Sequence, residues 1–247
     1  MARRRRPGPR LLARLAGAVI LAAAAAVLLV QVWFLAQVLW LARNPPTSTA
    51  FMDARLESLR ARAALEGKNP ERAVHLSHHW LPYARISSNL KRAVVAAEDA
   101  RFLEHGGLDW DAIERAIEKN QKRGRVVAGA STITQQLAKN LFLSGERSWS
   151  RKAQEAIIAW MLEATLSKRR ILELYLNVAE WAEGVFGAQA AARYHFGVDA
   201  SALNARQAAW LAAVLPSPRR YHRGRTTPYL EQRVAVILER MPSARIP

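Results

Sequence analysis

The longest pattern in the chain is an unbroken apolar run near its N-terminus. Residues 15–42 carry no charged side chain, and Gln31 and Gln37 are the only strongly polar ones. About 20 apolar residues span a hydrocarbon core of about 30 Å, so this run predicts a helix that crosses a membrane with some tilt. A cleavable signal peptide is the competing interpretation, but its apolar region is normally about 7–15 residues long and ends at a small-residue cleavage site. The run here is longer and ends at Trp40-Leu41-Ala42-Arg43, a poor cleavage site, so a retained anchor is favoured.

Beyond this run, apolar residues recur at helical spacing. Residues 53–65 predict a short charged helix after a linker at 44–49, and Ser87 or Ser88 is expected to cap a helix that ends near Glu98. Five later helices are predicted, with these apolar positions: Ala112, Ile113, Ala116 and Ile117; Ala156, Ile157, Trp160, Met161 and Ala164; Ile171, Leu172, Tyr175, Leu176 and Ala179; Leu203, Ala208, Leu211, Ala212 and Leu215; Leu230, Val234, Ile237 and Leu238. No stretch shows sustained period-two alternation with hairpin turns. The predicted class is all-α, with at most a minor strand pair.

The charge of the chain is strongly basic and unevenly distributed. Its 247 residues carry a formal net charge of +17 and no cysteine, which excludes disulfides and thiolate metal sites. Six arginines lie within the first 14 residues, and this basic cluster before the apolar run places the N-terminus in the cytoplasm and the rest of the chain across the membrane. The remainder is still basic, which suggests an anionic partner: nucleic acid, anionic lipid or a phosphorylated substrate.

Glu98 is the first candidate for catalysis. It lies one turn beyond Val94, at the edge of the apolar stripe of residues 90–97. A carboxylate on an apolar surface loses hydration, which raises its pKa, and a general base or acid that works near neutral pH needs such a setting. Glycines at 106 and 107 then allow the backbone to turn tightly around the acidic group. The alternative is an ordinary solvated helix end.

A stripe of uncharged polar residues marks a second predicted helix, residues 131–140, with Ser131 as its N-cap. Four side chains fall at i, i+3, i+4 and i+7 and therefore share one face: Thr132, Gln135, Gln136 and Lys139. Exposed helix faces favour Glu and Lys, so Thr and Gln beside a single Lys fit the wall of a sugar-binding groove better.

Positive charge is concentrated at the start of the predicted helix that contains Ala156 and Trp160. Arg147, Arg151 and Lys152 lie near its N-terminus, where cations are locally unfavourable by a few tenths of a kcal/mol each. Such a placement favours an anion site, because helix N-termini with Arg and Lys bind phosphates well. Glu155 follows one turn after Arg151. It is either half of an ordinary surface pair or a second catalytic carboxylate held ionised by its neighbours.

Two other patterns do not predict a metal-binding or catalytic site. The histidines at 75, 78 and 79 would need two further ligands to bind a metal, and no cysteine or close acidic residue supplies them. Ser88-Asn89-Leu90-Lys91 matches the Ser-x-x-Lys nucleophile pattern, but its partner patterns Ser-Asp-Asn and Lys-Thr-Gly are absent from the chain.

Six motifs occur in a fixed order between residues 80 and 221. They are Glu98-Asp99-x-x-Phe102-x-x-His105-x-Gly107; Gly129-x-Ser131-Thr132-Ile133-Thr134-Gln135-Gln136-x-x-Lys139-Asn140; Arg151-Lys152-x-x-Glu155; Lys168-x-x-Ile171-Leu172-Glu173-x-Tyr175-Leu176-Asn177; Gly184-Val185-Phe186-Gly187; and Leu215-Pro216-x-Pro218. Together they closely resemble the signature motifs of the peptidoglycan glycosyltransferases, lysozyme-like polymerases of bacterial cell-wall synthesis. Gly106 is a variation, since other members often carry proline there. The anchor and the lack of a transpeptidase domain point to the monofunctional branch, the biosynthetic peptidoglycan transglycosylases.

The resemblance implies a reaction and a role for each matched residue. Members of the family transfer a growing glycan from undecaprenyl pyrophosphate to the 4-hydroxyl of lipid II, with inversion at the anomeric carbon. Glu98 matches the base that takes the hydroxyl proton, and Glu155 would orient the cations or assist the leaving group. The cations that match the family's pyrophosphate side are Lys139, Arg147 and Arg151. Further substrate-binding residues are expected at Asp99, Arg101, Phe102, His105, Ser131, Thr132, Gln135, Gln136 and Asn140.

The same resemblance implies an organisation for the whole chain. We expect a cytoplasmic basic tail at 1–14, a transmembrane anchor at 15–42, a linker with a membrane-proximal helix at 43–75, and a glycosyltransferase domain at 76–247 on the outer side of the bacterial inner membrane. No cofactor is expected to be required, although a divalent cation, Mg²⁺ or Mn²⁺, could assist at the pyrophosphate. Expected partners are lipid II, lipid-linked glycan and membrane lipids, with cell-wall synthesis or division proteins as further candidates and no nucleic acid. Phe51 and Met52, close to the linker, are expected to dip into the lipid surface.

Two other functional classes remain open from the residues alone. A lysozyme-like hydrolase of peptidoglycan would also use a glutamate on a helical domain, but it has no pyrophosphate for three cations to bind. A membrane-tethered binding protein would use the basic surface and would not depend on Glu98. Polymer formation from a lipid-linked substrate separates both from the transferase.

Overall fold

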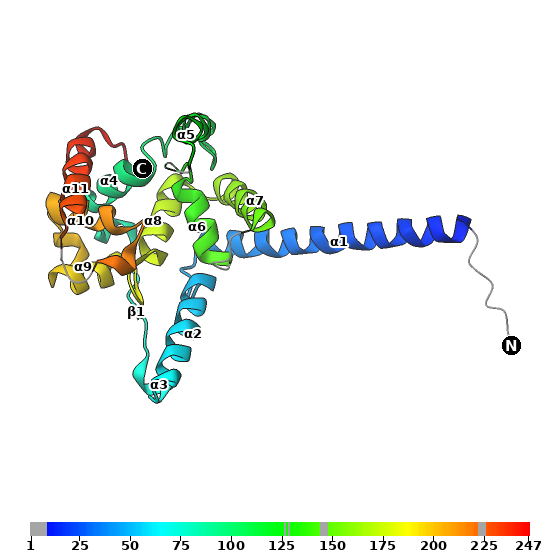
Figure 1. Cartoon of the computed structure of the whole chain (residues 1–247), viewed down its shortest axis with the longest axis horizontal. Helices are drawn as coiled ribbons and strands as arrows, with labels where there is room; N and C mark the ends of the chain where they lie inside the picture. The colour runs from blue at the N-terminus through cyan, green and yellow to red at the C-terminus, as the bar shows by residue number, and fades with distance from the viewer. Residues whose placement is uncertain (1–8, 126, 128, 144–147, 222–225) are drawn as a thin grey trace.

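A long N-terminal helix projects from a compact helical domain (Figure 1). The computed structural model describes residues 9–125, 127, 129–143, 148–221 and 226–247, apart from the side chains of residues 9 and 11–13. Helix α1 (Pro9–Leu41) contains a stretch, Arg14–Leu41, that is long and apolar enough to cross a membrane, and 6% of its most apolar window is buried. The predicted membrane-length helix is therefore present.

The C-terminal end of α1 belongs to the domain as well as to the anchor. Phe34 is 7% exposed, and its ring centroid lies 5.7 Å from that of Phe142. Gln31 and Gln154 exchange two amide hydrogen bonds of 3.0 and 2.9 Å. Because these contacts involve side chains within the last three turns of α1, the anchor meets the domain before it ends.

The core of the domain is formed by four helices whose inward side chains are almost fully buried. They are α4 (Ser88–Glu98), α6 (Ile133–Phe142), α8 (Lys168–Val178) and α10 (Ala205–Val214). The helices packed around them are α2 (Ala50–Leu65), α7 (Trp149–Thr165), α9 (Ala188–Phe196) and α11 (Pro228–Arg240), and a single turn, α3 (Pro70–Ala73), follows α2. Short 3₁₀ turns lie at Tyr83–Arg85, Ala200–Ala202, Pro218–Arg220 and Met241–Ser243. The all-α class is confirmed.

A small sheet closes one side of the domain. Strands β2 (Glu180–Ala182) and β3 (Val185–Phe186) are antiparallel, and β1 (Ser77–His78) adds to β3 in parallel, in the order β1-β3-β2. The pair β2–β3 is the minor strand pair that the sequence allowed, whereas β1 comes from a segment about a hundred residues earlier in the chain. Gly187 ends this unit at φ +81°, and a Cβ there would lie 2.7 Å from the carbonyl oxygen of Asn177.

The structure confirms the predicted N-cap of α4 and corrects that of α6. Ser87 caps α4, and Asp109 caps α5 (Trp110–Arg123), which Gly124 ends in the left-handed conformation. The N-cap of α6 is Thr132 rather than Ser131. The Thr132 side chain accepts a hydrogen bond from the backbone N–H of Gln135, and the Gln135 side chain accepts one from the backbone N–H of Thr132.

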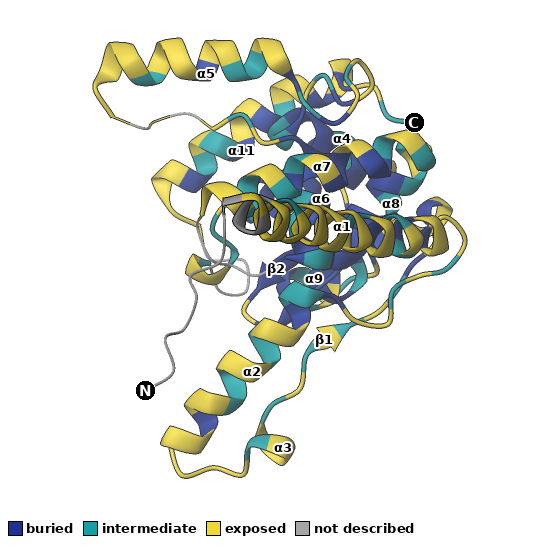
Figure 2. Cartoon of the chain, turned by 90° about the vertical axis from the view of Figure 1, so that its right-hand side faces the viewer, coloured by how far each residue is buried: buried dark blue, intermediate teal, exposed yellow. Residues whose placement is uncertain are grey.

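The predicted apolar faces of α5 and α7 are less buried than their patterns suggested. Helix α5 extends from the domain with most of its surface exposed (Figure 2), and Ile117 is 51% exposed. In α7 the buried residues are Glu155, Ile158, Ala159, Met161 and Leu162, whereas Ile157 and Trp160 are 42% and 65% exposed. Since α7 is apolar on two sides, its periodicity could not identify the side that faces the core.

Candidate active site

Glu98 ends α4 with its carboxylate held on both oxygens. The amide Nε2 of Gln136 donates to Oε2 at 2.9 Å, and the guanidinium Nη2 of Arg233, from α11, lies 3.5 Å from Oε1. The Glu98 side chain is 11% exposed. Burial raises its pKa above the usual range, and the Gln136 hydrogen bond and the positive charges of Arg233 and Lys139 oppose that rise only in part. The predicted shift in the pKa of this carboxyl group is confirmed in direction.

A buried tyrosine fixes the orientation of Gln136. The hydroxyl of Tyr175, on α8, donates to Gln136 Oε1 at 2.9 Å, so the amide nitrogen must point toward Glu98. Tyr175 is 1% exposed, and burial raises its pKa well above the usual range, which keeps the hydroxyl protonated as a donor. The sequence placed Tyr175 in an apolar stripe and in one of the six motifs, but it gave this residue no role in the site.

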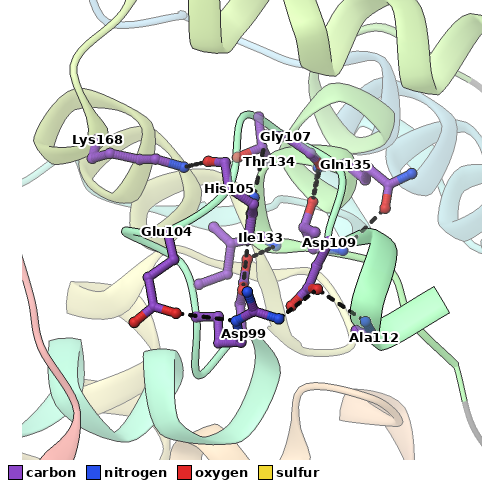
Figure 3. Close-up of polar contacts among 12 residues, drawn as sticks. Asp99, Glu104, His105, Gly107, Asp109, Ala112, Ile133, Thr134, Gln135 and Lys168 are labelled. Carbon is purple, nitrogen blue, oxygen red and sulfur yellow. Dashed lines mark hydrogen bonds and ion pairs between the residues drawn. The ribbon is translucent and has the colours of Figure 1, made fainter. Parts of the chain in front are cut away.

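The loop after Glu98 is tied to the start of α6 by Asp99 and His105 (Figure 3). Asp99 Oδ2 accepts from the backbone N–H of Ile133 at 3.0 Å, and Asp99 Oδ1 lies 2.9 Å from Nε2 of His105. His105 Nδ1 accepts from the N–H of Gly107 at 3.2 Å, so Nε2 carries the proton that is donated to Asp99. The Gly107 carbonyl in turn accepts from the Thr132 hydroxyl at 2.6 Å. Asp99 and His105 therefore bind each other and backbone N–H groups, while Thr132 binds a backbone carbonyl.

Other residues expected to bind substrate lie around the same loop. Phe102 is fully buried, with the Lys168 ammonium 4.6 Å from its ring centroid. Gln135 is 3% exposed and its amide is used in the α6 capping box. Arg101 faces outward and pairs with Asp111 and Glu104. Their roles in substrate binding stay predictions.

The cationic side of the site is built around a buried carboxylate. Glu155, with its side chain 4% exposed, pairs with Arg151 at 2.8 Å and also with Lys152. Lys152 Nζ donates to the Ser131 hydroxyl at 3.1 Å, which links α7 to the start of α6. Burial of this kind argues against an ordinary surface pair, because a buried carboxylate requires compensation by its partners. Arg147, also predicted here, lies outside the described residues.

Lys139 also belongs to the cationic side, and among the described residues its ammonium has no hydrogen-bond or ion-pair partner. Burial lowers the pKa of Lys139, and the ring centroid of Phe51 lies 5.8 Å from its ammonium. A cavity of about 390 Å³ is lined by residues from both sides of the site, among them Gln136, Lys139, Asn140, Arg151 and Tyr175. A second cavity, of about 260 Å³, is lined by Glu98, Asp99, Arg101, Ser131 and Thr132.

The structure thus separates the predicted residues into two groups. Gln136, Lys139, Asn140 and Arg151 share the larger cavity, and Gln136 joins it to the smaller one by its bond to Glu98. The smaller cavity is lined by Glu98, Asp99, Arg101, Ser131 and Thr132. Phe102, His105 and Gln135 are not among the lining residues of either cavity. Sequence reasoning missed Arg233, Tyr175 and the α2 residues Phe51 and Arg55, which also line the larger cavity. The prediction for Met52 was wrong: this side chain is 3% exposed and lies in the core.

Comparisons with known proteins identify the family of the chain. The family model described as Transglycosylase matches residues 67–242. The chain is 55% identical over 221 residues to the biosynthetic peptidoglycan transglycosylase of Janthinobacterium sp. (strain Marseille), covering 90% of this chain and 92% of that protein. It is 53% identical over 238 residues to the protein of that name from Thiobacillus denitrificans, covering 96% and 99%. The corresponding protein of Bordetella pertussis is 52% identical over 238 residues, covering 95% of each chain. The chain therefore belongs to the transglycosylase family, alongside the biosynthetic peptidoglycan transglycosylases, which are glycosyltransferases.

Proposed function

We propose that the chain polymerises peptidoglycan glycan strands from lipid II. The growing strand, carried on undecaprenyl pyrophosphate, would be the donor, and the 4-hydroxyl of lipid II the acceptor. The observation that carries this proposal is the juxtaposition of a buried, oriented carboxylate with a cation-lined cavity: Glu98 is joined through Gln136 to the cavity that contains Lys139 and Arg151. A glycosyl transfer with a pyrophosphate leaving group needs a base and cations at opposite ends of one displacement.

The proposed step is a single displacement. Glu98 takes the proton of the acceptor hydroxyl as its oxygen forms a bond to the anomeric carbon of the donor. The bond from that carbon to the pyrophosphate oxygen breaks, and the electron pair leaves with the pyrophosphate. Lys139 and Arg151 stabilise the charge that develops on this leaving group. Glu155 orients Arg151 through their 2.8 Å ion pair. Attack from the face opposite the leaving group inverts the configuration.

We propose no resident cofactor for this step. Four cationic side chains already line the cavity, those of Arg55, Lys139, Arg151 and Arg219. A Mg²⁺ or Mn²⁺ ion would enter as a companion of the pyrophosphate. Protein partners from cell-wall synthesis or division stay predictions.

We also propose that the domain lies on the outer face of the bacterial inner membrane, with the arginine-rich tail in the cytoplasm. If Arg14 marks the inner boundary of the hydrocarbon, Gln31 lies about 26 Å further along α1, close to the outer boundary of a core about 30 Å thick. The side chain of Gln31 is hydrogen-bonded to that of Gln154 in α7. The domain would therefore rest on the membrane where a lipid-linked substrate is held.

The test is polymerisation of labelled lipid II by the detergent-solubilised full chain. We expect the wild type to make long, lysozyme-sensitive glycan and Glu98→Gln to be slower by about 100-fold or more, the usual contribution of a positioned base. Glu231→Gln, which removes an exposed carboxylate on α11, should retain activity within about twofold. Degradation of preformed glycan without polymer formation would establish a hydrolase instead. Normal polymerisation by Glu98→Gln would refute the assignment of the base.

A further inference from the structure

Helix α2 contributes a wall of the cavity that holds Lys139 and Arg151. Its residues Phe51 and Arg55 line that cavity together with Lys139 and Arg151. The match to the family model begins at residue 67, after α2 has ended at Leu65. A helix that the sequence assigned to a membrane-proximal linker thus lines the cavity proposed for the pyrophosphate.

The contacts of α2 hold it firmly in place. Arg55 makes a two-pronged ion pair with Glu180 of β2, with distances of 2.7 and 3.0 Å, and the two side chains are 12% and 4% exposed. The Phe51 ring packs edge-on against Phe186 of β3, with their centroids 6.4 Å apart. Because α2 is fixed to both strands, its cavity-facing side chains are preorganised.

The position of Phe51 brings an apolar surface directly beside the cations. Its ring centroid is 5.8 Å from the Lys139 ammonium and 5.8 Å from the centre of the Arg55 guanidinium. Leu215 and Pro216 line the same cavity. A phosphate group alone would require only the cations. Apolar side chains next to them suit a ligand that carries a hydrocarbon chain directly on its phosphate.

The path of the chain indicates where that hydrocarbon would come from. Only residues 42–49 separate the end of α1 from the start of α2, so the Phe51 end of α2 is the end nearest the anchor. A ligand whose tail stays in the membrane would reach Lys139 past this end of the helix.

We propose that Phe51 binds the isoprenoid chain of a polyprenyl pyrophosphate at the point where the chain joins the phosphate, while Lys139 and Arg151 bind the pyrophosphate. This inference rests on the proposed function, since it takes the lipid pyrophosphate of the donor or product as the ligand. It assigns to α2 a part in recognising the lipid rather than the sugar.

Direct binding to the detergent-solubilised full chain tests this without turnover. The probes are farnesyl pyrophosphate, which has a short isoprenoid chain, and inorganic pyrophosphate, which has none. We expect Phe51→Ala to weaken binding of farnesyl pyrophosphate roughly tenfold, the scale of one buried apolar contact, and to change binding of inorganic pyrophosphate less than about twofold. Phe51→Leu, which keeps an apolar side chain, should stay within about threefold of wild type for both probes.

Leu65→Ala is the matched control on the same helix, because Leu65 is 90% exposed at the end far from the cavity, and it should bind both probes as wild type does. Equal weakening of both probes by Phe51→Ala would overturn the proposal, since Phe51 would then only support Lys139. Unchanged binding of both probes would overturn it as well. A wild type that binds farnesyl pyrophosphate through Phe51 but forms no polymer would refute the proposed function and leave this inference standing.

Discussion

The hydroxyl of Tyr175 provides a sharp test of how the base is positioned. In Tyr175→Phe, Gln136 Oε1 loses the donor that lies 2.9 Å away, so only the bond from Nε2 to Glu98 still orients the amide. The amide is then less rigidly held, and its hydrogen bond to the carboxylate is weakened. Tyr175→Phe therefore affects Glu98 through Gln136, although neither of those two residues is substituted.

The expected size of the effect follows from the burial of the pair. Tyr175 is 1% exposed, and leaving a buried acceptor without its donor costs about 1–3 kcal/mol. If about half of that cost, about 0.5–1.5 kcal/mol, falls on the alignment of Gln136, kcat/KM decreases by roughly two- to tenfold, since a factor of ten corresponds to about 1.4 kcal/mol. The sign of the pH effect is also determined. The Gln136 hydrogen bond lowers the pKa of Glu98, so its loss raises that pKa and moves the acidic limb of the activity profile to higher pH.

The assay is the pH profile of kcat/KM for polymerisation of lipid II by wild type and Tyr175→Phe. Tyr83→Phe is the matched control: its hydroxyl is also poorly exposed and donates at 2.6 Å to the carbonyl of Pro247, away from Glu98. The charged groups that act on Glu98, namely Asp99, Lys139 and Arg233, are unchanged in both variants. A Tyr175→Phe profile that superimposes on that of wild type would refute the reasoning. An equal shift in Tyr83→Phe would show that the effect is not specific to the contact with Gln136.

Two further predictions concern stability. Gly187→Ala should lower the free energy of unfolding by about 3 kcal/mol or more, because φ is +81° and the new Cβ would lie 2.7 Å from the Asn177 carbonyl oxygen. The control in thermal unfolding is Gly106→Ala, whose Cβ meets no atom within 4 Å and whose midpoint should remain near that of wild type. Equal midpoints for the two variants would contradict the steric argument. Glu98→Gln should raise the unfolding midpoint while it removes activity, because the raised pKa of Glu98 means that the folded state disfavours the ionised carboxylate. This gain should be larger at pH 8 than at pH 5, since the folded state loses stability as the pH rises through the raised pKa, and a gain that is independent of pH would contradict it.

The sequence predicted the parts of the site that depend on local patterns. The apolar stripe of α4 placed Glu98 at the edge of the core, and the cluster at the start of α7 placed Arg151 and Lys152 beside Glu155. Both inferences needed only helical periodicity over a few turns. Both inferences are confirmed because α4 and α7 form over these residues.

The parts that the sequence could not predict depend on contacts between distant segments. Arg233 reaches Glu98 from 135 positions further along the chain. Phe51 lies close to Lys139, although the sequence placed it in the linker segment, before a helix predicted to begin at residue 53. Helix periodicity also placed Thr132 and Gln135 on the same face as Gln136, but α6 begins only at Ile133, so those two side chains cap the helix. A spacing rule describes residues inside a helix and fails at its first turn.

The balance of effects on Glu98 suggests why the base is assembled from separate elements. Burial is the largest influence on its pKa and raises it, whereas Gln136, Arg233 and Lys139 lower it. Of the two cations among these three residues, Lys139 also lines the cavity proposed for the pyrophosphate. On the proposed mechanism, a bound pyrophosphate offsets the positive charge of Lys139 and adds negative charge nearby, so the pKa of Glu98 rises further when the donor is present. The carboxylate therefore becomes a stronger base in the complex that needs one, and it remains a weaker base in the empty site, where Lys139 is not neutralised.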